Sequence, residues 1–143
     1  MTNAWTPKDT TTHQDQIIAH VLGTTILGYF VFDEVLYIVL DIGFIWSIFL
    51  DGGMGLLPHP VAMSELEVEG QTKEQLKADI DVLLSNSADK RLLRFTLPPV
   101  PCQIKGVGFF ADGEQRRLLI SGETGNVAIE TSLTTAGIRV HAA

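Results

Sequence analysis

The sequence predicts an α+β fold with mainly antiparallel sheets and two helices, in the order α-βββ(β)-α-ββββ(β). The first observation is a series of short runs rich in Val, Ile, Tyr, Phe and Trp, separated by turn signals that contain Gly, Asn or Asp. The second is a pair of polar segments in which apolar residues recur at helical spacing behind a capping residue. The third is the length of 143 residues, which suits about one domain.

The first helix is expected to begin at Thr12. This residue can serve as the N-cap, with Asp15 three residues later in an acidic variant of the capping box. Gly23 suits the C-terminal cap of the same helix. Residues 1–11 are polar and are expected to form a flexible tail, so that a single α+β domain spans residues 12–143.

A three-stranded meander is expected next, over Ile26–Phe32, Val35–Leu40 and Phe44–Leu50. Turn residues at Asp33-Glu34 and at Gly43 separate these strands. Both faces of the meander are apolar. In an antiparallel sheet with one solvent-exposed face, by contrast, apolar and polar residues alternate along each strand. Both faces are therefore expected to be covered, one by the helices and the other by the second half of the chain or by a second copy.

The remaining residues predict one more helix and a second group of strands. The helix is expected to begin at Thr72, with Gln75 completing its cap, and a Gly/Pro-rich loop is expected over Asp51–Ser64, with a fourth strand near Leu66–Glu69. The recurrence of a helix followed by strands raises the alternative of an internal duplication, although the halves do not align residue by residue. The later strands are expected at 92–97, 103–111, 116–121, 127–132 and 138–141.

The long apolar stretch from Val35 to Gly53 does not fit a membrane span. A span needs about 20 mostly apolar residues, and Asp41 would place a costly carboxylate near its middle. No basic residue flanks the stretch to fix an orientation. The N-terminus also lacks the basic region and apolar run of a secretory signal. The sequence therefore predicts a protein that neither crosses nor binds a membrane.

Charge is distributed unevenly along the chain. Residues 1–70 contain one base and nine acids, whereas the remainder contains nine bases and eight acids, which together give the net charge of −7. Such an acidic first half repels phosphate and argues against a nucleic-acid partner. It serves either solubility or the docking of a basic protein partner. The single cysteine, Cys102, excludes an intramolecular disulfide and fits a reducing, cytoplasmic location.

Few residues stand out as candidates for catalysis or metal binding. His59 lies between two prolines in the Gly/Pro loop, near Asp51, and this pair could supply a general base and its partner. The acids of the Asp33-Glu34 turn are alternative partners for the imidazole. His13 and His20 lie seven residues apart, not at the spacing of zinc ligands on a helix, so no metal is expected. No phosphate-loop motif is complete, and no cofactor is expected.

Three classes of function remain open from the sequence. The first is a non-catalytic binding or interaction module of the small, soluble bacterial type, which forms a homodimer through an apolar patch of Tyr37, Ile45 and Phe49. The second is an inhibitor or immunity-type protein whose acidic half binds a basic partner. The third is a small hydrolase or isomerase that uses His59 with Asp51. The absence of a catalytic motif favours a protein that is not an enzyme.

Overall fold

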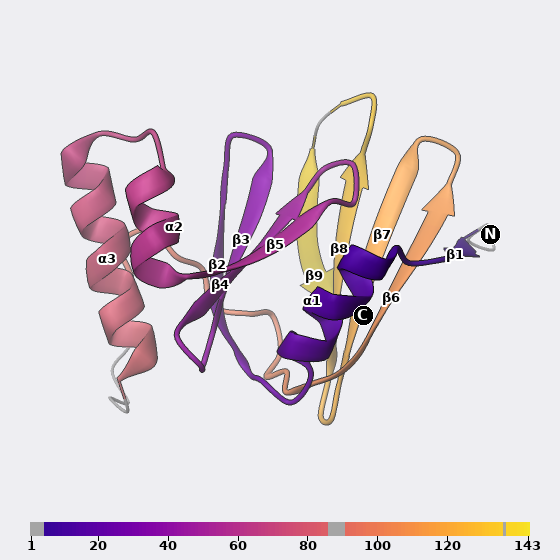
Figure 1. Cartoon of the computed structure of the whole chain (residues 1–143), viewed down its shortest axis with the longest axis horizontal. Helices are drawn as coiled ribbons and strands as arrows, with labels where there is room; N and C mark the ends of the chain where they lie inside the picture. The colour runs from indigo at the N-terminus through magenta and orange to yellow at the C-terminus, as the bar shows by residue number, and fades with distance from the viewer. Residues whose placement is uncertain (1–4, 86–90, 136) are drawn as a thin grey trace.

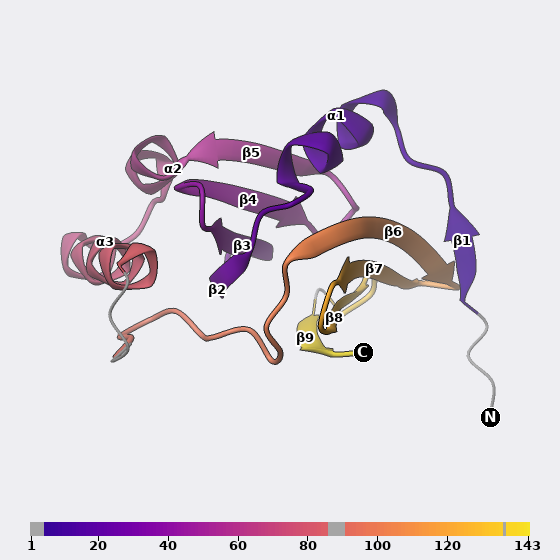
Figure 2. The same cartoon turned by 90° about the horizontal axis from the view of Figure 1, so that it is seen from below.

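The protein is an α+β structure built in three layers. The computed structural model describes residues 5–85, 91–135 and 137–143. Within these ranges the chain forms three helices, a four-stranded sheet and a five-stranded sheet, and both sheets are antiparallel. Figures 1 and 2 show the four-stranded sheet between helices α2 and α3 on one side and the five-stranded sheet on the other. The predicted fold class is confirmed.

The four-stranded sheet contains the predicted meander and one strand that was not predicted. Its strands pair in the order β2-β3-β4-β5, and they span Ile26–Phe32, Val35–Leu40, Phe44–Phe49 and Met54–Pro58. The fourth strand therefore lies inside the predicted Asp51–Ser64 loop, and the strand expected near Leu66–Glu69 is absent from the described structure. The loop prediction failed because β5 forms by pairing with β4. As an edge strand, β5 tolerates a proline at its end, where Pro58 lies.

Two helices cover the outer face of this sheet. Helix α2, His59–Glu65, occupies the second part of the predicted loop, and Pro60 fits its first turn. Helix α3, Gly70–Leu84, begins two residues before Thr72 and has no side-chain cap. Buried residues of both helices share one apolar cluster with Val39 and Ile45 of the sheet, and this burial substitutes for the local capping that the sequence suggested.

Helix α1, Thr12–Val21, lies at the edge of the layer between the two sheets. Its capping box lies one residue earlier than predicted: the Thr11 hydroxyl accepts a hydrogen bond from the Gln14 backbone N–H at 3.1 Å, and the Gln14 side chain accepts one from the Thr11 N–H at 2.8 Å. Gly23 follows the helix with a φ of +86°, the left-handed conformation expected after a C-cap.

The five-stranded sheet has the order β1-β6-β7-β8-β9. Strands β6 to β9 confirm four of the five predicted later strands; they span Ile104–Asp112, Gln115–Gly122, Asn126–Ser132 and Ile138–Ala142. Strand β1, Thr6–Lys8, lies within the predicted tail and pairs with the end of β6. Three residues of the expected tail therefore pair in a sheet, whereas residues 1–4 lie outside the described structure.

The segment predicted as a strand over 92–97 does not join either sheet as a strand. Its backbone is joined to β2 by one isolated bridge at Thr96, which exchanges two hydrogen bonds with Tyr29 at 2.8 and 2.9 Å. The prolines at 98, 99 and 101 follow at once, and a proline cannot donate to a sheet ladder. The segment instead runs from α3 toward β6 along the edge of the four-stranded sheet.

Both faces of the meander are buried within one chain. One face packs on the five-stranded sheet and on α1, and it includes Leu36, Ile38 and the fully buried Trp46. The opposite face packs on α2, α3 and Phe95. The second half of the chain, rather than a second copy, therefore covers the face that the helices leave open. The element order places a helix before four strands twice, but the internal duplication remains a prediction.

Candidate functional site

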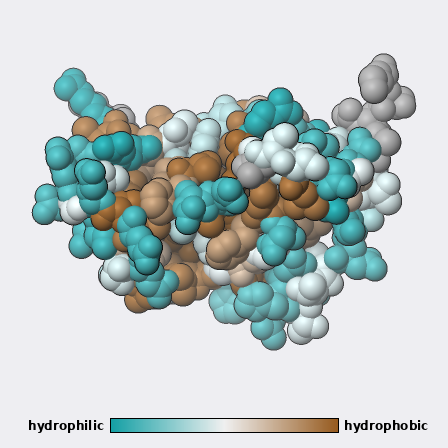
Figure 3. Space-filling model, turned by 90° about the horizontal axis from the view of Figure 1, so that it is seen from above, coloured by the Kyte–Doolittle hydropathy of each residue, from teal (hydrophilic) through white to brown (hydrophobic). Residues whose placement is uncertain are grey.

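A cleft of about 270 Å³ lies where the tip of the β4–β5 hairpin overhangs the five-stranded sheet. Strands from both sheets supply its walls. The apolar lining residues are Ile48, Phe49, Leu50, Phe109, Phe110, Leu118, Ile129 and Leu133. Figure 3 views the molecule from above this end and shows apolar surface broken by polar groups. The cleft thus combines apolar walls with a polar rim, as small-molecule sites do.

Helix α1 and strand β8 hold the hairpin tip above the sheet. The Gln14 side chain, whose oxygen completes the capping box, also donates from Nε2 to the Gly52 carbonyl at 2.7 Å. The His13 ring lies 3.1 Å from the Met54 carbonyl, and the Thr131 hydroxyl donates to the Leu50 carbonyl at 3.4 Å. A helix terminus therefore positions one wall of the cleft.

The rim of the cleft carries charges of both signs. Lys8 is the last residue of β1 and Asp9 follows it, whereas Asp51 belongs to the hairpin tip and Arg116 to β7. The Arg116 guanidinium donates from Nη1 to the carbonyls of residues 113 and 115 at 2.7 and 2.9 Å. Asp51 accepts a hydrogen bond from the backbone N–H of residue 53 at 2.9 Å, which closes its own turn. These bonds fix two rim side chains without neutralising their charges.

The predicted catalytic pair is not brought together. Asp51 lines the cleft, but His59 is the first residue of α2 and lies at the other end of β5. Asp33 and Glu34 form the exposed β2–β3 turn. Of the predicted catalytic residues, only Asp51 therefore belongs to the cleft.

The three predicted interface residues do not form one exposed patch. Ile45 is 1% exposed and lies beneath α2 and α3, whereas Phe49 is 43% exposed and lines the cleft. Tyr37 stacks on Phe30 with 4.9 Å between ring centroids, and burial, followed by the negative charges of Asp33 and Glu65, raises the pKa of its hydroxyl. Ile45 is buried and therefore cannot belong to an exposed patch, so the predicted set of interface residues is wrong at this position. Self-association itself stays a prediction.

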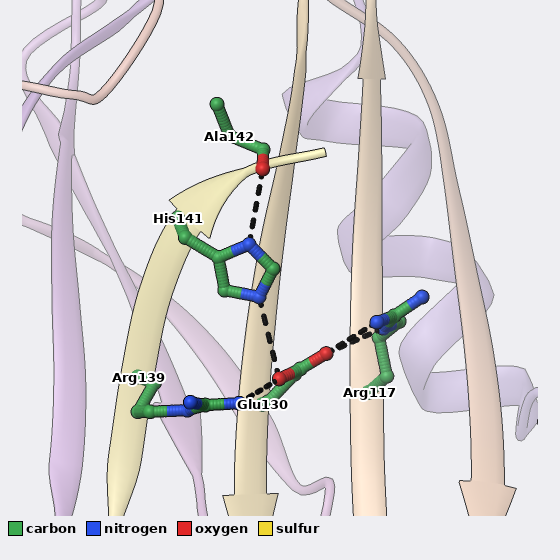
Figure 4. A network of polar contacts seen from close by, with 5 residues as sticks. All are labelled: Arg117, Glu130, Arg139, His141 and Ala142. Carbon is green, nitrogen blue, oxygen red and sulfur yellow. Dashed lines mark hydrogen bonds and ion pairs between the residues drawn. The ribbon is translucent and has the colours of Figure 1, made fainter. Parts of the chain in front are cut away.

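Sequence reasoning missed a charged row on the outer face of the five-stranded sheet (Figure 4). Arg117, Glu130 and Arg139 lie directly opposite one another on β7, β8 and β9. The Glu130 side chain is only 9% exposed and accepts hydrogen bonds from both arginines. His141 Nε2 lies 3.3 Å from the same carboxylate, and the Trp5 ring lies 4.6 Å from the Arg117 guanidinium carbon.

Two opposing effects act on the Glu130 carboxyl. Burial alone raises its pKa, but the hydrogen bonds from Arg117 and Arg139, the contact with His141 and the charge of Arg117 outweigh burial and lower the pKa to about 2. The carboxylate is thus ionised at neutral pH. The printed sequence gave no sign of this row. Arg117 and Glu130 are thirteen residues apart, and the strand register that places them opposite one another is set by tertiary pairing.

Asp79 is a second buried carboxylate that the sequence analysis did not single out. It is 1% exposed and accepts backbone N–H bonds from Leu93, Arg94 and Phe95 at 2.6 to 2.8 Å. Its position three residues after Leu76, on the apolar stripe of α3, was the available signal. The three bonds anchor the segment that follows α3.

Neither a metal site nor a membrane span is present among the residues that the structure describes. No three His, Cys, Asp or Glu side chains there gather as ligands would, and no helix there is long and apolar enough to cross a bilayer. His20 contacts the Gln16 carbonyl of its own helix at 2.8 Å. Cys102 is buried, and burial raises the pKa of its thiol, which leaves it a packed side chain rather than an activated nucleophile.

No protein-family model, no curated protein and no solved structure matches this chain.

Proposed function

We propose that the protein is a non-catalytic binding module that holds a small ligand in the cleft between its two sheets. The observation that carries the proposal is a recess of about 270 Å³ with apolar walls and charged lining residues, one side of which is held in place by the first turn of helix α1. Drug-sized ligands occupy pockets of roughly 300–1,000 Å³, so a ligand for this cleft is smaller than a typical drug.

The alternative functions have less support in the structure. A hydrolase or isomerase would need a base and its partner within hydrogen-bond reach, and His59 and Asp51 lie at opposite ends of a strand. An inhibitor of a basic protein would present a continuous acidic face, and the cleft is not such a face because Lys8 and Arg116 line it together with Asp9 and Asp51. Binding in the cleft is the function that the geometry supports best.

The proposal is tested by the binding of a small apolar probe. Indole is titrated into the protein while amide chemical shifts are followed by NMR. The expected result is saturable shifts in the β4–β5 turn and in the facing strands β7 and β8. Light scattering on the same sample reports whether the protein self-associates.

A pair of substitutions locates the binding site. Leu133 lines the cleft and is 41% exposed, so Leu133→Trp can fill the mouth without disturbing the core. Leu97 is 47% exposed and does not line the cleft, so Leu97→Trp is the matched control. We expect Leu133→Trp to weaken indole binding at least tenfold and Leu97→Trp to leave it unchanged. Shifts confined to other surfaces, or equal binding by both variants, would refute the proposal.

A further inference from the structure

The charges around the cleft come in balanced numbers. Two cations, Lys8 and Arg116, and two carboxylates, Asp9 and Asp51, lie on its rim. Arg117 also lines the cleft, but its guanidinium pairs with Glu130 on the outer face of the five-stranded sheet. This balance is unusual for the chain, which carries a net charge of −7 and has no Lys or Arg between Asp9 and Gln71.

The four rim charges do not form ion pairs with one another. Among residues 5–85, 91–135 and 137–143, no carboxylate lies within ion-pair distance of Lys8 or Arg116, and no Lys or Arg pairs with Asp9 or Asp51. Arg116 is held in place by backbone carbonyls, and the Asp51 carboxylate is oriented by a backbone N–H. Charged groups that are held in position but not paired remain able to pair with a ligand.

These charges also stand on different elements. Arg116 belongs to β7, on the five-stranded sheet, whereas Asp51 belongs to the hairpin tip of the four-stranded sheet. A ligand that carries one positive and one negative group can therefore pair with both walls of the cleft. A simple anion would face Asp9 and Asp51, and a simple cation would face Lys8 and Arg116, so each would meet repulsion as well as attraction.

We infer that the ligand is a zwitterion with an apolar body: a free α-amino acid with a large apolar side chain. Its carboxylate would pair with Arg116 and Lys8, its ammonium group with Asp51 and Asp9, and its side chain would pack on Phe49, Phe109 and Leu118. The volume of the cleft suits a single residue of this kind better than a longer chain. This inference rests on the proposed function, because it names the ligand class of the same cleft.

Three probes that share the same apolar group, a phenyl ring on a two-carbon chain, test the inference. Phenylalanine carries both charges, 3-phenylpropionate lacks the ammonium group, and phenethylamine lacks the carboxylate. Isothermal titration calorimetry on the full chain is expected to show phenylalanine binding at least tenfold more tightly than either of the other two. Equal or tighter binding of a singly charged probe would overturn the inference.

Rim substitutions give a second readout. Arg116→Gln is expected to weaken the binding of phenylalanine and 3-phenylpropionate at least fivefold and to leave the binding of phenethylamine unchanged or tighter. Asp51→Asn is expected to weaken the binding of phenylalanine and phenethylamine at least fivefold and to leave the binding of 3-phenylpropionate unchanged or tighter. Lys105→Gln is the matched control, because Lys105 is an exposed base of β6 outside the cleft. Circular dichroism melting of each variant verifies that it is folded. Equal responses of all three probes to Arg116→Gln and to Asp51→Asn would overturn the charge pairing.

The indole titration separates this inference from the proposed function. If indole binds in the cleft but phenylalanine binds no better than the singly charged probes, the cleft is a ligand site and the zwitterion inference is wrong. If neither indole nor any of the three charged probes binds in the cleft, the proposed function and the inference both fail.

Discussion

The Glu130 carboxylate is expected to contribute about 3 kcal/mol to stability at neutral pH. Its pKa falls from 4.5 to about 2 in the folded protein, and each pKa unit corresponds to about 1.4 kcal/mol of preference for the ionised form. Because its side chain is 9% exposed, solvent screens this interaction little. Glu130→Gln removes the charge and leaves the 22%-exposed Arg117 without its partner, while Arg139, 76% exposed, can turn to water.

The direction of the pH effect follows from the lowered pKa. A carboxyl whose folded pKa lies below its unfolded pKa stabilises the protein fully above the unfolded value and loses that stabilisation as pH falls toward the folded value. The difference in unfolding free energy between the native protein and Glu130→Gln is therefore expected to be about 3 kcal/mol at pH 7 and to shrink between about pH 4.5 and pH 2.

Urea unfolding followed by circular dichroism measures this difference. Glu123→Gln is the matched control, since Glu123 pairs with Lys105 at 3.3 Å but both side chains are more than half exposed. An exposed pair of this kind contributes less than about 1 kcal/mol. The reasoning would be refuted if Glu130→Gln were no more destabilising at pH 7 than Glu123→Gln, or if its effect were the same at pH 3 as at pH 7.

Three further predictions concern the residues that hold the scaffold together. Gln14→Ala should cost about 1 kcal/mol by removing the capping box, whereas Gln14→Glu should keep the box and shift only the NMR signals near Gly52, to which it can no longer donate. Asp79→Ala should cost about 3 kcal/mol or more and speed amide exchange at residues 93–95, with Asp79→Asn in between, because three buried N–H groups lose a charged acceptor. Replacing Asp33-Glu34 by Asn-Gly should raise the unfolding free energy by about 1 kcal/mol in thermal melts, since both residues have a positive φ of 51° and 64°.

Local sequence patterns were sufficient for most individual elements. The three strands of the meander were predicted to within one residue, because their apolar runs are bounded by turn residues such as Gly43, which adopts a φ of +79°. Helix α1 was predicted for the same reason, since its cap and its apolar stripe are both local. Even the two apolar faces of the meander were assigned correctly, because side-chain direction alternates with strand period.

Elements that depend on distant partners were predicted poorly. Strand β5 and helix α2 occupy a segment whose glycines and prolines resemble a loop, and β5 exists because Leu56 and Leu57 pair opposite Trp46 and Ile45 on β4. The segment at 92–97 has strand-like composition but is held by Asp79 and by one bridge to Tyr29. In each case contacts far apart in sequence outweigh local propensity.

The candidate site shows the same division. The sequence by itself determined the composition, the charge imbalance between the two halves, the period of each strand and the presence of two apolar faces. Only the tertiary structure decided that the second sheet covers one of those faces, and that Asp51 lines a cleft with Arg116 of a distant strand, whereas His59 lies outside that cleft. The physical reason is that strand period and turn chemistry act over a few residues, whereas the pairing of sheets and the convergence of charges depend on packing between segments more than fifty residues apart.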